Sequence, residues 1–474
     1  MDINDEGGGG AEDSDDARAL PPGQPRGAPL TIDFEGQAIR AFVGESVAVA
    51  LLAGDIRTLG RSSKYHRPRG GFCFDGHCAS CYLRIDGRPN LRACMTPVAP
   101  GLRCERQNAF PTADVDLLTA ADWLFPGGMD HHTLMTGTRL GNRLFLKLVR
   151  QMGGSGTLPD PDTIAGAANA APAANPEAIT VDVCVVGAGP AGLTAAQVMA
   201  AAPARPRVLV IDEQAVPGGS LLAEPGGSIR AAALAGAAQA AGARLLGQAT
   251  AIAFYPEDIG PDGKPGVLAV AAPDHLLRVS ARRFVYATGA YDQNLPFVDN
   301  DRPGIISARG CGRLAFHHGV RPARAGGRIV VLAATPHAFR LAAGLTAAGL
   351  DVGIVDLARE RVLGARGVQA VRGVDVAAIG ADPAATAAAR TVRGDVVAVG
   401  VLPAPASELP RQHGATVTLD PARGGFAVIV DDRFVAAADV FACGDVTGYG
   451  GPDAALASGE QAGRSVVKQL ESAS

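Results

Sequence analysis

Residues 181–203 read VDVCVVGAGPAGLTAAQVMAAAP, which is an apolar strand, a glycine turn and an alanine-rich helix in succession. In this G-x-G-x-x-G pattern, Gly187 permits the tight turn, Gly189 lets a pyrophosphate approach the backbone, and Gly192 lets the helix pack on the strand. The free N–H groups at the start of the helix would face the phosphates. The stretch therefore predicts a dinucleotide-binding Rossmann unit.

An acidic pair follows at the distance that such a unit needs. The sequence RVLVIDE (207–213) reads as the second strand, and it ends in Asp212 and Glu213. An acidic residue about 20 positions beyond the glycine turn accepts hydrogen bonds from the ribose hydroxyls of the dinucleotide. The sequence leaves open which of the two carboxylates does so.

Strand and helix signals alternate through the second half of the chain, as in a parallel, doubly wound sheet. Residues 326–357 repeat the strand–helix–strand rhythm, so we expect two Rossmann-like units with the second inserted in the first. We place the first part of the FAD-type unit at 179–300, the inserted NAD(P)-type unit at 301–420 and the return of the first unit at 421–474.

The inserted unit lacks the glycine turn. Where glycines are expected, residues 330–339 read VVLAATPHAF, so a nicotinamide dinucleotide would meet Ala and Pro side chains instead of bare backbone. We therefore expect this unit to be degenerate and keep NAD(P) as an alternative ligand only.

Two later segments favour FAD over NAD in the first unit. Thr288-Gly289 follows a strand, where the chain crosses between units, and Gly444-Asp445 ends another strand before a second glycine-rich helix start. A carboxylate at this position could bond a ribityl hydroxyl. The alternative role for Asp445 is a helix cap.

A group of closely spaced cysteines lies near the amino end of the chain. Four cysteines have the spacing C-x4-C-x2-C-x12-C in CFDGHCASCYLRIDGRPNLRAC (73–94), and this is the plant-type [2Fe–2S] spacing. Thiolates are the soft ligands that such clusters take. The runs YLRI and NLRAC predict two strands joined at Asp86-Gly87, and this hairpin would return the fourth cysteine to the loop. The predicted ligands are Cys73, Cys78, Cys81 and Cys94.

Structural zinc is the competing interpretation of these cysteines. Zinc sites usually pair two short Cys knuckles, and this segment has one C-x2-C. We expect His77 to tune the cluster or to face solvent, because four cysteines complete the ligand set. Cys104 reads as a small buried residue in a strand.

Composition excludes several other classes of protein. The 474 residues carry 43 basic and 47 acidic side chains, a formal charge of −4, so no basic face for nucleic acid is implied. No apolar run is long enough for a membrane span, and the acidic start is unlike a signal peptide. Cysteines gathered in one cluster favour a cytoplasmic metal or redox protein over a disulfide-bonded one.

The remaining segments are expected to connect or flank these units. Residues 1–27 read as a disordered acidic tail, 28–108 as the ferredoxin-like domain, 109–158 as a helical arm and 159–178 as a Pro- and Ala-rich linker.

Several stretches resemble one known family. GRSSKYHRPRG (60–70), FCFDGHCASCYLRIDGRPNLRACMTP (72–97), IDEQAVPGGSLL (211–222) and NDRPGII (300–306) are similar to the α subunits of heteromeric sarcosine oxidase and its relatives. Those relatives are hydrogen cyanide synthase, opine oxidases and proline or hydroxyproline dehydrogenases. The resemblance implies an α/β, thioredoxin-reductase-like flavoprotein fold that follows a small β-grasp, ferredoxin-like domain.

The resemblance also implies roles for individual residues. It assigns the four cysteines to the [2Fe–2S] cluster. It assigns the dinucleotide to Gly187, Gly189, Pro190, Ala191, Gly192, Asp212, Glu213, Gln214, Gly219, Ser220, Leu221, Thr288, Gly289, Gly444 and Asp445. In sarcosine oxidase itself, the α subunit lacks the cluster cysteines, binds NAD in this unit and carries a folate-related domain further on. The cysteines and the Gly-Asp motif of this chain favour the dehydrogenase branch, with FAD.

We therefore expect an electron-transfer flavoprotein and iron–sulfur subunit of a heteromeric oxidoreductase acting on CH–NH donors. The resemblance implies an FAD-dependent, amine-oxidising β-type partner subunit, with room for further small subunits, and no catalytic residue in this chain. One alternative is a self-sufficient NAD(P)H-dependent FAD/[2Fe–2S] reductase. The other is a non-redox scaffold subunit with structural zinc and nucleotide.

Overall fold

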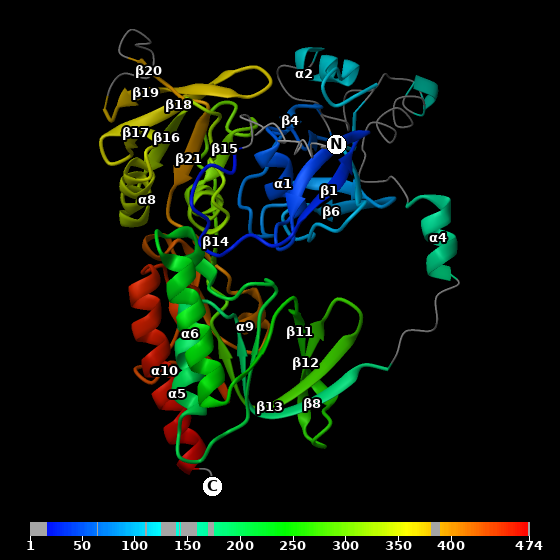
Figure 1. Ribbon diagram of the computed structural model, residues 1–474. Coiled ribbons are helices and arrows are strands. Elements are labelled where there is room, and N and C mark those ends of the chain that lie inside the picture. The colour runs from blue at the N-terminus through cyan, green and yellow to red at the C-terminus, as the bar shows by residue number, and fades with distance from the viewer. Residues whose placement is uncertain are drawn as a thin grey trace, which may run out of the picture.

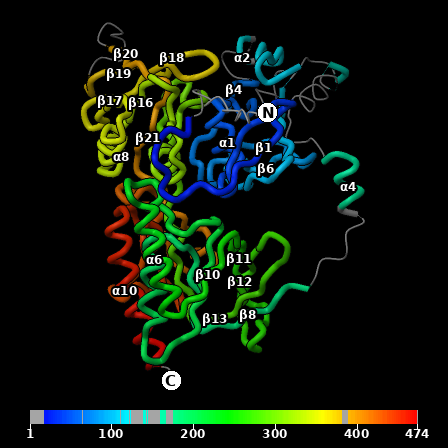
Figure 2. Tube along the Cα trace, in the orientation of Figure 1, coloured from blue at the N-terminus to red at the C-terminus, as the bar shows by residue number. Residues whose placement is uncertain are grey.

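The computed structural model describes residues 17–63, 65–109, 111–124, 139–141, 143, 159–168, 175–380 and 389–472. The main parts are an amino-terminal domain, a large dinucleotide-binding unit and a smaller unit inserted in the latter (Figure 1). The amino-terminal domain and the carboxyl end lie at opposite ends of the molecule (Figure 2). None of the described helices is both long and apolar enough to span a membrane.

The amino-terminal domain contains a mixed five-stranded sheet. The strand order is β2 (Gln37–Phe42), β1 (Pro29–Phe34), β7 (Arg103–Glu105), β5 (Tyr82–Ile85) and β6 (Arg88–Arg92). Strands β1 and β7 are parallel, and the other neighbours are antiparallel. The predicted hairpin at Asp86-Gly87 is present, and Cys104 is buried in β7 as predicted. A second hairpin joins β1 and β2 at Glu35-Gly36.

Helix α1 (Val47–Ala53) lies at the centre of this domain. Every residue of the helix is buried, because the run VAVALLA is apolar on all sides. Ser46 caps its start by accepting a hydrogen bond from the N–H of Val49. The apolar core around α1 continues into the inserted unit, where it includes Ile306 and Leu314. The amino-terminal domain and the inserted unit therefore share one core.

Residues 17–27 pack on this domain, so the prediction of a disordered tail is wrong for them. Leu20 is buried, and the Arg18 guanidinium donates two hydrogen bonds of 2.7 Å to the Glu45 carboxylate. The N–H of Ala17 also bonds the carbonyl of Ala53 at 3.1 Å. The composition of this stretch gave no sign of these contacts, because each is made with a residue distant in sequence.

The dinucleotide-binding unit is built on an eight-stranded sheet. The order is β10 (Arg244–Leu246), β9 (Val208–Ile211), β8 (Glu177–Val186), β13 (Leu276–Tyr286), β12 (Pro265–Ala271) and β11 (Thr250–Ile259), with β26 (Val440–Ala442) beside β13 and β25 (Val435–Ala437) beside β26. Strands β10, β9, β8, β13 and β26 are parallel. Helix α5 (Pro190–Ala200) packs against both α6 (Gly227–Ala241) and α10 (Pro452–Ser472) (Figure 1).

The sheet is not parallel throughout, which corrects the prediction. Strands β11, β12 and β13 are antiparallel neighbours. The turn between β11 and β12 is closed by a 2.7 Å hydrogen bond from the N–H of Gly260 to the carbonyl of Lys264. A connection this short contains no crossover helix, so the chain can return only as an antiparallel strand.

The inserted unit has two layers of strands. Its parallel sheet has the order β15 (Ile305–Ser307), β21 (Val396–Gly400), β16 (Arg328–Ala333) and β17 (Asp351–Asp356), with α8 (Pro336–Ala347) after β16. An antiparallel sheet follows, made of β18 (Glu360–Gly367), β19 (Val371–Ala378) and β20 (Arg390–Arg393). The chain then returns to the first sheet through β26.

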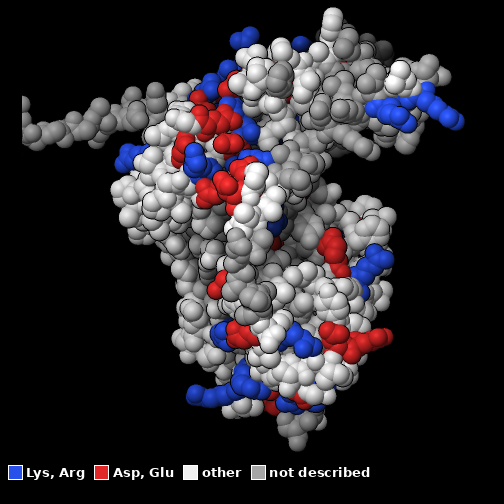
Figure 3. Space-filling model, turned by 90° about the vertical axis from the view of Figure 1, so that its right-hand side faces the viewer, with Lys and Arg blue, Asp and Glu red and all other residues white. Residues whose placement is uncertain are grey.

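Short elements connect these parts. They are β3 (Gly60–Arg61), β4 (Pro68–Arg69), η3 (Gly219–Ala223), β14 (Ala290–Tyr291), α7 (Ala308–Gly312), the π-helical turn η4 (Arg313–His317), β22 (Ala404–Pro405), α9 (Glu408–Gln412), β23 (Val417–Asp420), η6 (Pro421–Arg423), β24 (Gly425–Val428) and η7 (Gly444–Thr447). Basic and acidic side chains are intermixed on the face shown in Figure 3.

Most of the predicted arm, 109–158, lies outside the described residues. Its described part contains η1 (Leu117–Thr119) and α2 (Ala120–Leu124). The stretch expected to be a linker, 159–178, contains a short helix, α4 (Pro161–Ala168). Asp160, just before that helix, pairs with Arg84 of β5 at 2.5 Å, so the start of the stretch is tied to the amino-terminal domain.

Glu45→Ala tests whether the segment around Arg18 is part of the folded domain. We expect the free energy of unfolding to fall by about 3–5 kcal/mol, because the variant removes the carboxylate that neutralises a buried guanidinium. Urea and thermal unfolding would measure the loss. In the control, Asp160→Ala removes a pair whose Asp side chain is 56% exposed, and it should cost less than about 1 kcal/mol. Equal losses in both variants would contradict an anchoring role for Arg18.

Candidate functional site

The glycine turn between β8 and α5 has the geometry that its sequence predicts. A Cβ atom at Gly187 (φ +107°) would lie 2.2 Å from the carbonyl oxygen of Ala287, and one at Gly192 would lie 1.9 Å from that of Gly187. At Gly189 the nearest atom to such a Cβ would be the Gly219 Cα, at 3.9 Å. Close packing therefore requires two of these glycines, and the third leaves the backbone bare at the start of α5.

The two acids at the end of β9 differ in their surroundings. The Asp212 carboxylate accepts hydrogen bonds from the N–H groups of Ala188, at 2.5 Å, and Gln214, at 2.8 Å. Burial raises the pKa of Asp212 from its usual 3.8 to about 6, although these two N–H groups oppose the shift. Glu213 Oε1 lies 3.7 Å from Nδ1 of His77. Because Asp212 is engaged by the glycine turn, Glu213 is the better candidate for the ribose hydroxyls.

The two later motifs end neighbouring strands at the same edge of the sheet. Thr288 and Gly289 follow β13, Gly444 follows β26, and these strands are parallel neighbours. A Cβ at Gly444 (φ +77°) would lie 2.8 Å from the Cβ of Ala191 in α5. The turn after β26 therefore passes directly over the start of the helix that faces the predicted phosphates.

Asp445 both holds a loop and faces the site. Its side chain is buried and accepts a 3.2 Å hydrogen bond from the N–H of Gly450, in the loop that leads into α10. Burial raises the pKa of Asp445, and the Arg309 guanidinium acts in the opposite direction. The Asp445 carboxylate can thus hold this loop and still face a ligand in the groove.

A groove of about 650 Å³ lies across these strand ends. All of the predicted dinucleotide-binding residues line it except Gly192 and Leu221. Gly192 lies inside the contact between the glycine turn and α5, and Leu221 is buried in a small apolar core beside α6. Sequence reasoning missed Arg309 and Arg313, which also line the groove and have no motif around them. The volume is in the ordinary range for cofactor sites.

The two arginines bring buried positive charge to the groove. Arg309 pairs with Asp292 at 2.5 Å, and Arg313 pairs with Asp75 at 2.6 Å. Burial would lower the pKa of Arg309, but Asp292 leaves it raised. Within the described part of the chain, Nη1 of Arg313 is buried and has no hydrogen-bond partner. An unpaired buried N–H group is costly, so this nitrogen marks a place where the polar contacts of the groove wall are incomplete.

The four predicted cluster cysteines converge beside the groove. The thiol of Cys73 lies beside the thiols of Cys78 and Cys94, and the thiol of Cys81 lies beside that of Cys94. These contacts lower the pKa of Cys73 and Cys81 and raise the pKa of their partners. Among the described residues, no three His, Cys, Asp or Glu side chains surround a single metal position. The four thiols nevertheless form one connected group, in which Cys73 and Cys94 each lie beside two others. Four Cys thiolates are the ligand set of a [2Fe–2S] cluster.

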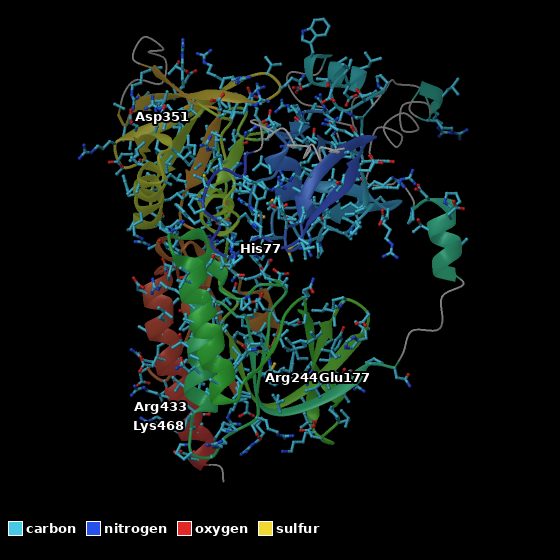
Figure 4. All side chains as sticks on the ribbon, in the orientation of Figure 1. His77, Glu177, Arg244, Asp351, Arg433 and Lys468 are labelled. Atoms are coloured by element: carbon cyan, nitrogen blue, oxygen red, sulfur yellow. The ribbon has the colours of Figure 1, made fainter. Side chains whose placement is uncertain are left out.

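His77 belongs to the cysteine loop and lines the groove, where the amino-terminal domain faces the dinucleotide-binding unit (Figure 4). Its Nε2 is 3.4 Å from Asp75, its Nδ1 faces Glu213, and its ring centre is 4.9 Å from that of Tyr291. Burial would lower the pKa of His77, but the two carboxylates leave it raised. The cysteine loop therefore contacts the acid that is placed for the ribose.

The inserted unit presents a different helix start. Both helices begin with a proline, but Thr335 Oγ1 accepts the N–H of Ala338 at 3.3 Å, whereas no side chain caps the start of α5. His337 in the same turn pairs with Glu224 at 2.8 Å. The start of α8 therefore offers fewer free N–H groups to a phosphate than the start of α5.

Comparison with known proteins reproduces this division of the chain. Residues 181–462 match the family described as pyridine nucleotide-disulphide oxidoreductase, over more than half of the chain. The chain belongs to this family. Residues 27–109 match the 2Fe-2S iron-sulfur cluster binding domain, which confirms the predicted iron–sulfur character of the amino-terminal part of this oxidoreductase. Both cofactors of the sequence prediction, FAD and the [2Fe–2S] cluster, are supported by these matches.

The relatives of this oxidoreductase confirm the resemblance seen in its sequence. It is 30% identical to the alpha subunit of sarcosine oxidase from Rhizobium meliloti over 398 residues, which cover 74% of this chain and 38% of that subunit. It is 42% identical to the hydrogen cyanide synthase subunit HcnA of Pseudomonas aeruginosa over 81 residues, 17% of this chain and 77% of HcnA. The chain thus spans less than two fifths of the sarcosine oxidase subunit.

A solved structure shares the fold of this oxidoreductase. The L-proline dehydrogenase from P. horikoshii superimposes with a TM-score of 0.70, over 96% of this chain and 76% of that chain, at 20% identity. The likeness extends over both the iron–sulfur domain and the dinucleotide-binding units. The predicted fold class is therefore confirmed.

Gly192→Ala tests the close packing of the glycine turn. We expect the free energy of unfolding to fall by roughly 1–3 kcal/mol, because the new methyl group must displace the Gly187 carbonyl. The bound flavin should be lost as α5 shifts. The matched control is Gly236→Ala in α6, where a Cβ would meet nothing within 4 Å. This control should be neutral or more stable by about 0.5–1 kcal/mol. A stable, fully flavinated Gly192→Ala variant would contradict the packing argument.

Asp212→Asn tests the raised pKa of that carboxyl. In the cofactor-free protein, the folded state holds the Asp212 proton more tightly than the unfolded chain does. Its contribution to stability is therefore complete below about pH 4 and is lost as the pH rises through about 6. The difference amounts to roughly 3 kcal/mol. Thermal unfolding of both proteins at a series of pH values should show a smaller fall between pH 4 and 6 in the variant. Parallel curves would show that Asp212 does not titrate in this range.

Proposed function

We propose that this chain is the electron-transfer FAD and [2Fe–2S] subunit of a heteromeric complex that oxidises the CH–NH bond of an amine or amino acid. The substrate class is that of sarcosine, proline, hydroxyproline or opines. The observation that carries the proposal is the groove, whose wall includes both the dinucleotide-binding residues and the loop of the cluster cysteines. Asp75 and His77 of that loop line the same groove as Glu213.

The residues of this chain would hold the two groups and fix their distance. When bound, the flavin exchanges one or two electrons and the cluster exchanges one, so together they couple a two-electron donor to a one-electron acceptor. Glu213 would accept the ribose hydroxyls, and the bare backbone at Gly189 would meet the pyrophosphate. Asp445 would accept a hydrogen bond from a ribityl hydroxyl, and Arg309 and Arg313 would bring positive charge to the groove wall.

The carboxylates of the groove are arranged for binding rather than for proton transfer. Asp212 and Asp445 are bonded to backbone N–H groups, and Asp75 is paired with Arg313. We therefore assign the oxidation of the substrate to an FAD-dependent β-type partner subunit. The names of the sarcosine oxidase, hydrogen cyanide synthase and opine oxidase relatives support this assignment, because each name describes one subunit of an enzyme.

The inserted unit argues against a self-sufficient NAD(P)H-dependent reductase. Such an enzyme needs a second dinucleotide site in front of α8. There the Thr335 side chain already caps the helix, whereas the start of α5 has no side-chain cap. A phosphate at this helix would replace existing contacts instead of meeting bare backbone.

Anaerobic purification with the products of neighbouring genes tests the proposal as a whole. We expect a flavin absorption spectrum, iron and acid-labile sulfide in equal amounts, and a [2Fe–2S] EPR signal after reduction with dithionite. Zinc without iron would support the scaffold alternative. Rapid bleaching of the flavin by NADH, without an amine substrate, would support the reductase alternative.

Asp445→Ala tests the flavin assignment at the level of one residue. We expect the dissociation constant for FAD to rise roughly 10- to 100-fold, because a buried carboxylate hydrogen bond contributes about 1.5–3 kcal/mol. Fluorescence titration of the flavin-free protein would measure it. Asp453→Ala, at the exposed start of α10, is the matched control and should bind FAD like the wild type. Equal binding by the Asp445→Ala variant would remove Asp445 from the site.

A further inference from the structure

The iron–sulfur domain supplies part of the wall of the dinucleotide groove. Asp75, Gly76 and His77, from the loop between the first two cluster cysteines, line the groove, and so does Arg92 at the end of β6. Arg92 Nη1 donates a 2.5 Å hydrogen bond to the carbonyl of Gly76, which ties the loop to the hairpin that carries the fourth cysteine. The groove is therefore incomplete without this domain.

Direct contacts join the loop to the dinucleotide-binding unit. Gln214 Nε2 donates to the backbone carbonyl of Asp75 at 3.2 Å and lies 3.4 Å from Sδ of Met95, which follows the fourth cysteine. The carboxylate of Asp75 forms the buried 2.6 Å pair with Arg313. Each contact links a residue beside a cluster cysteine to a residue of the groove wall.

The conformation of the loop depends on what holds its cysteines. Phe74 (φ +51°) and Ala79 (φ +57°) are non-glycine residues in the left-handed region, and Gly76 has φ +86°. Such conformations persist where surrounding contacts fix them. The N–H of Asp75 donates to Sγ of Cys73 at 3.4 Å, so the sulfur itself is one of these contacts. A change at the cysteines would therefore move the groove wall.

We propose that the cysteine loop is a working part of the dinucleotide site, so that the [2Fe–2S] cluster and the dinucleotide each increase the affinity of the protein for the other. The inference rests on the proposed function, because it takes the groove ligand to be FAD. The bound cluster fixes the loop, and the loop then holds Arg313, Gln214 and Glu213 at the groove. The bound dinucleotide, in turn, holds these three side chains against the loop.

Thermodynamic linkage makes the proposal measurable from both sides. If cluster loss weakens FAD binding by a factor, FAD loss must weaken cluster binding by the same factor. Coupling of this kind typically amounts to roughly 5- to 150-fold. A cluster and a flavin that merely share a chain would show no such factor.

The experiment titrates FAD into flavin-free protein with its cluster intact and into the same protein after anaerobic removal of iron by a chelator. We expect the dissociation constant to rise roughly 5- to 150-fold without the cluster. In the reverse arm, saturating FAD should slow the loss of the cluster absorbance to the chelator, because the loop that surrounds the cluster is then held by the dinucleotide. Equal FAD affinities together with equal rates of cluster loss would overturn the proposal.

A variant separates the contact from general damage to the domain. Asp75→Asn removes the charge that pairs with Arg313 and keeps the shape of the side chain. We expect weaker FAD binding in a protein that retains its iron and its reduced EPR signal. The matched control is Asp122→Asn, which removes a 2.6 Å pair with Arg67 in the same half of the chain, away from the groove, and should bind FAD normally. Unchanged affinity in Asp75→Asn would contradict the proposal.

The outcomes distinguish this proposal from the function on which it rests. Failure of the cluster-containing wild type to bind any FAD would contradict the proposed function. FAD binding that is equally tight with and without the cluster, together with equal rates of cluster loss, would leave the proposed function intact and overturn only the coupling. Chelation could unfold the domain, or the Asp75→Asn variant could lose iron. In either case the rate at which the wild-type protein loses its cluster, with and without FAD, tests the coupling, and equal rates would overturn it.

Discussion

The buried ion pair between Asp75 and Arg313 is the contact on which the arrangement of the site depends. The Arg313 side chain is 5% exposed and that of Asp75 14%, so each charge has little water to stabilise it and relies on the other. Asp75 belongs to the cysteine loop, and Arg313 begins the π-helical turn that follows α7. Within its own loop the Asp75 carboxylate has only the more distant ring of His77, 3.4 Å away. The pair therefore sets where the iron–sulfur domain meets the groove.

Apolar packing supports this polar contact from the other side of the domain. Helix α1 is apolar on every face, so the sheet of its own domain cannot cover it completely, and its core continues into the inserted unit at Ile306 and Leu314. The iron–sulfur domain is thus anchored by hydrophobic burial on one side and by the Asp75 loop on the other. Two anchors of different kinds fix both the position and the orientation of the domain, which a flexible linker would not do.

Much of the fold and of the site could be predicted from the sequence because it depends on local chemistry. The glycine turn, the cysteine spacing and the two hairpins each carry their signal within a short stretch. The rest depends on long-range contacts. Arg309 and Arg313 acquire their role only when α7 reaches the groove, and Leu221 enters an apolar core although it follows a dinucleotide motif. The packing of residues 17–27 could not be predicted for the same reason, because Arg18 pairs with Glu45, which is distant in sequence.

The charges along the groove also determine how a dinucleotide can lie in it. Five carboxylates line the groove, those of Asp75, Asp212, Glu213, Glu408 and Asp445. Two N–H groups stabilise the charge of Asp212, and Arg313 pairs with Asp75. Glu213 at the end of β9 and Asp445 after β26 suit hydroxyl donors. They would therefore mark the positions of the ribose and of the ribityl chain of the ligand. The phosphates then fall between them, at the bare backbone and positive end of α5. The cysteine loop contacts both Glu213 and Arg313, so the iron–sulfur domain takes part in setting the charge of the groove wall.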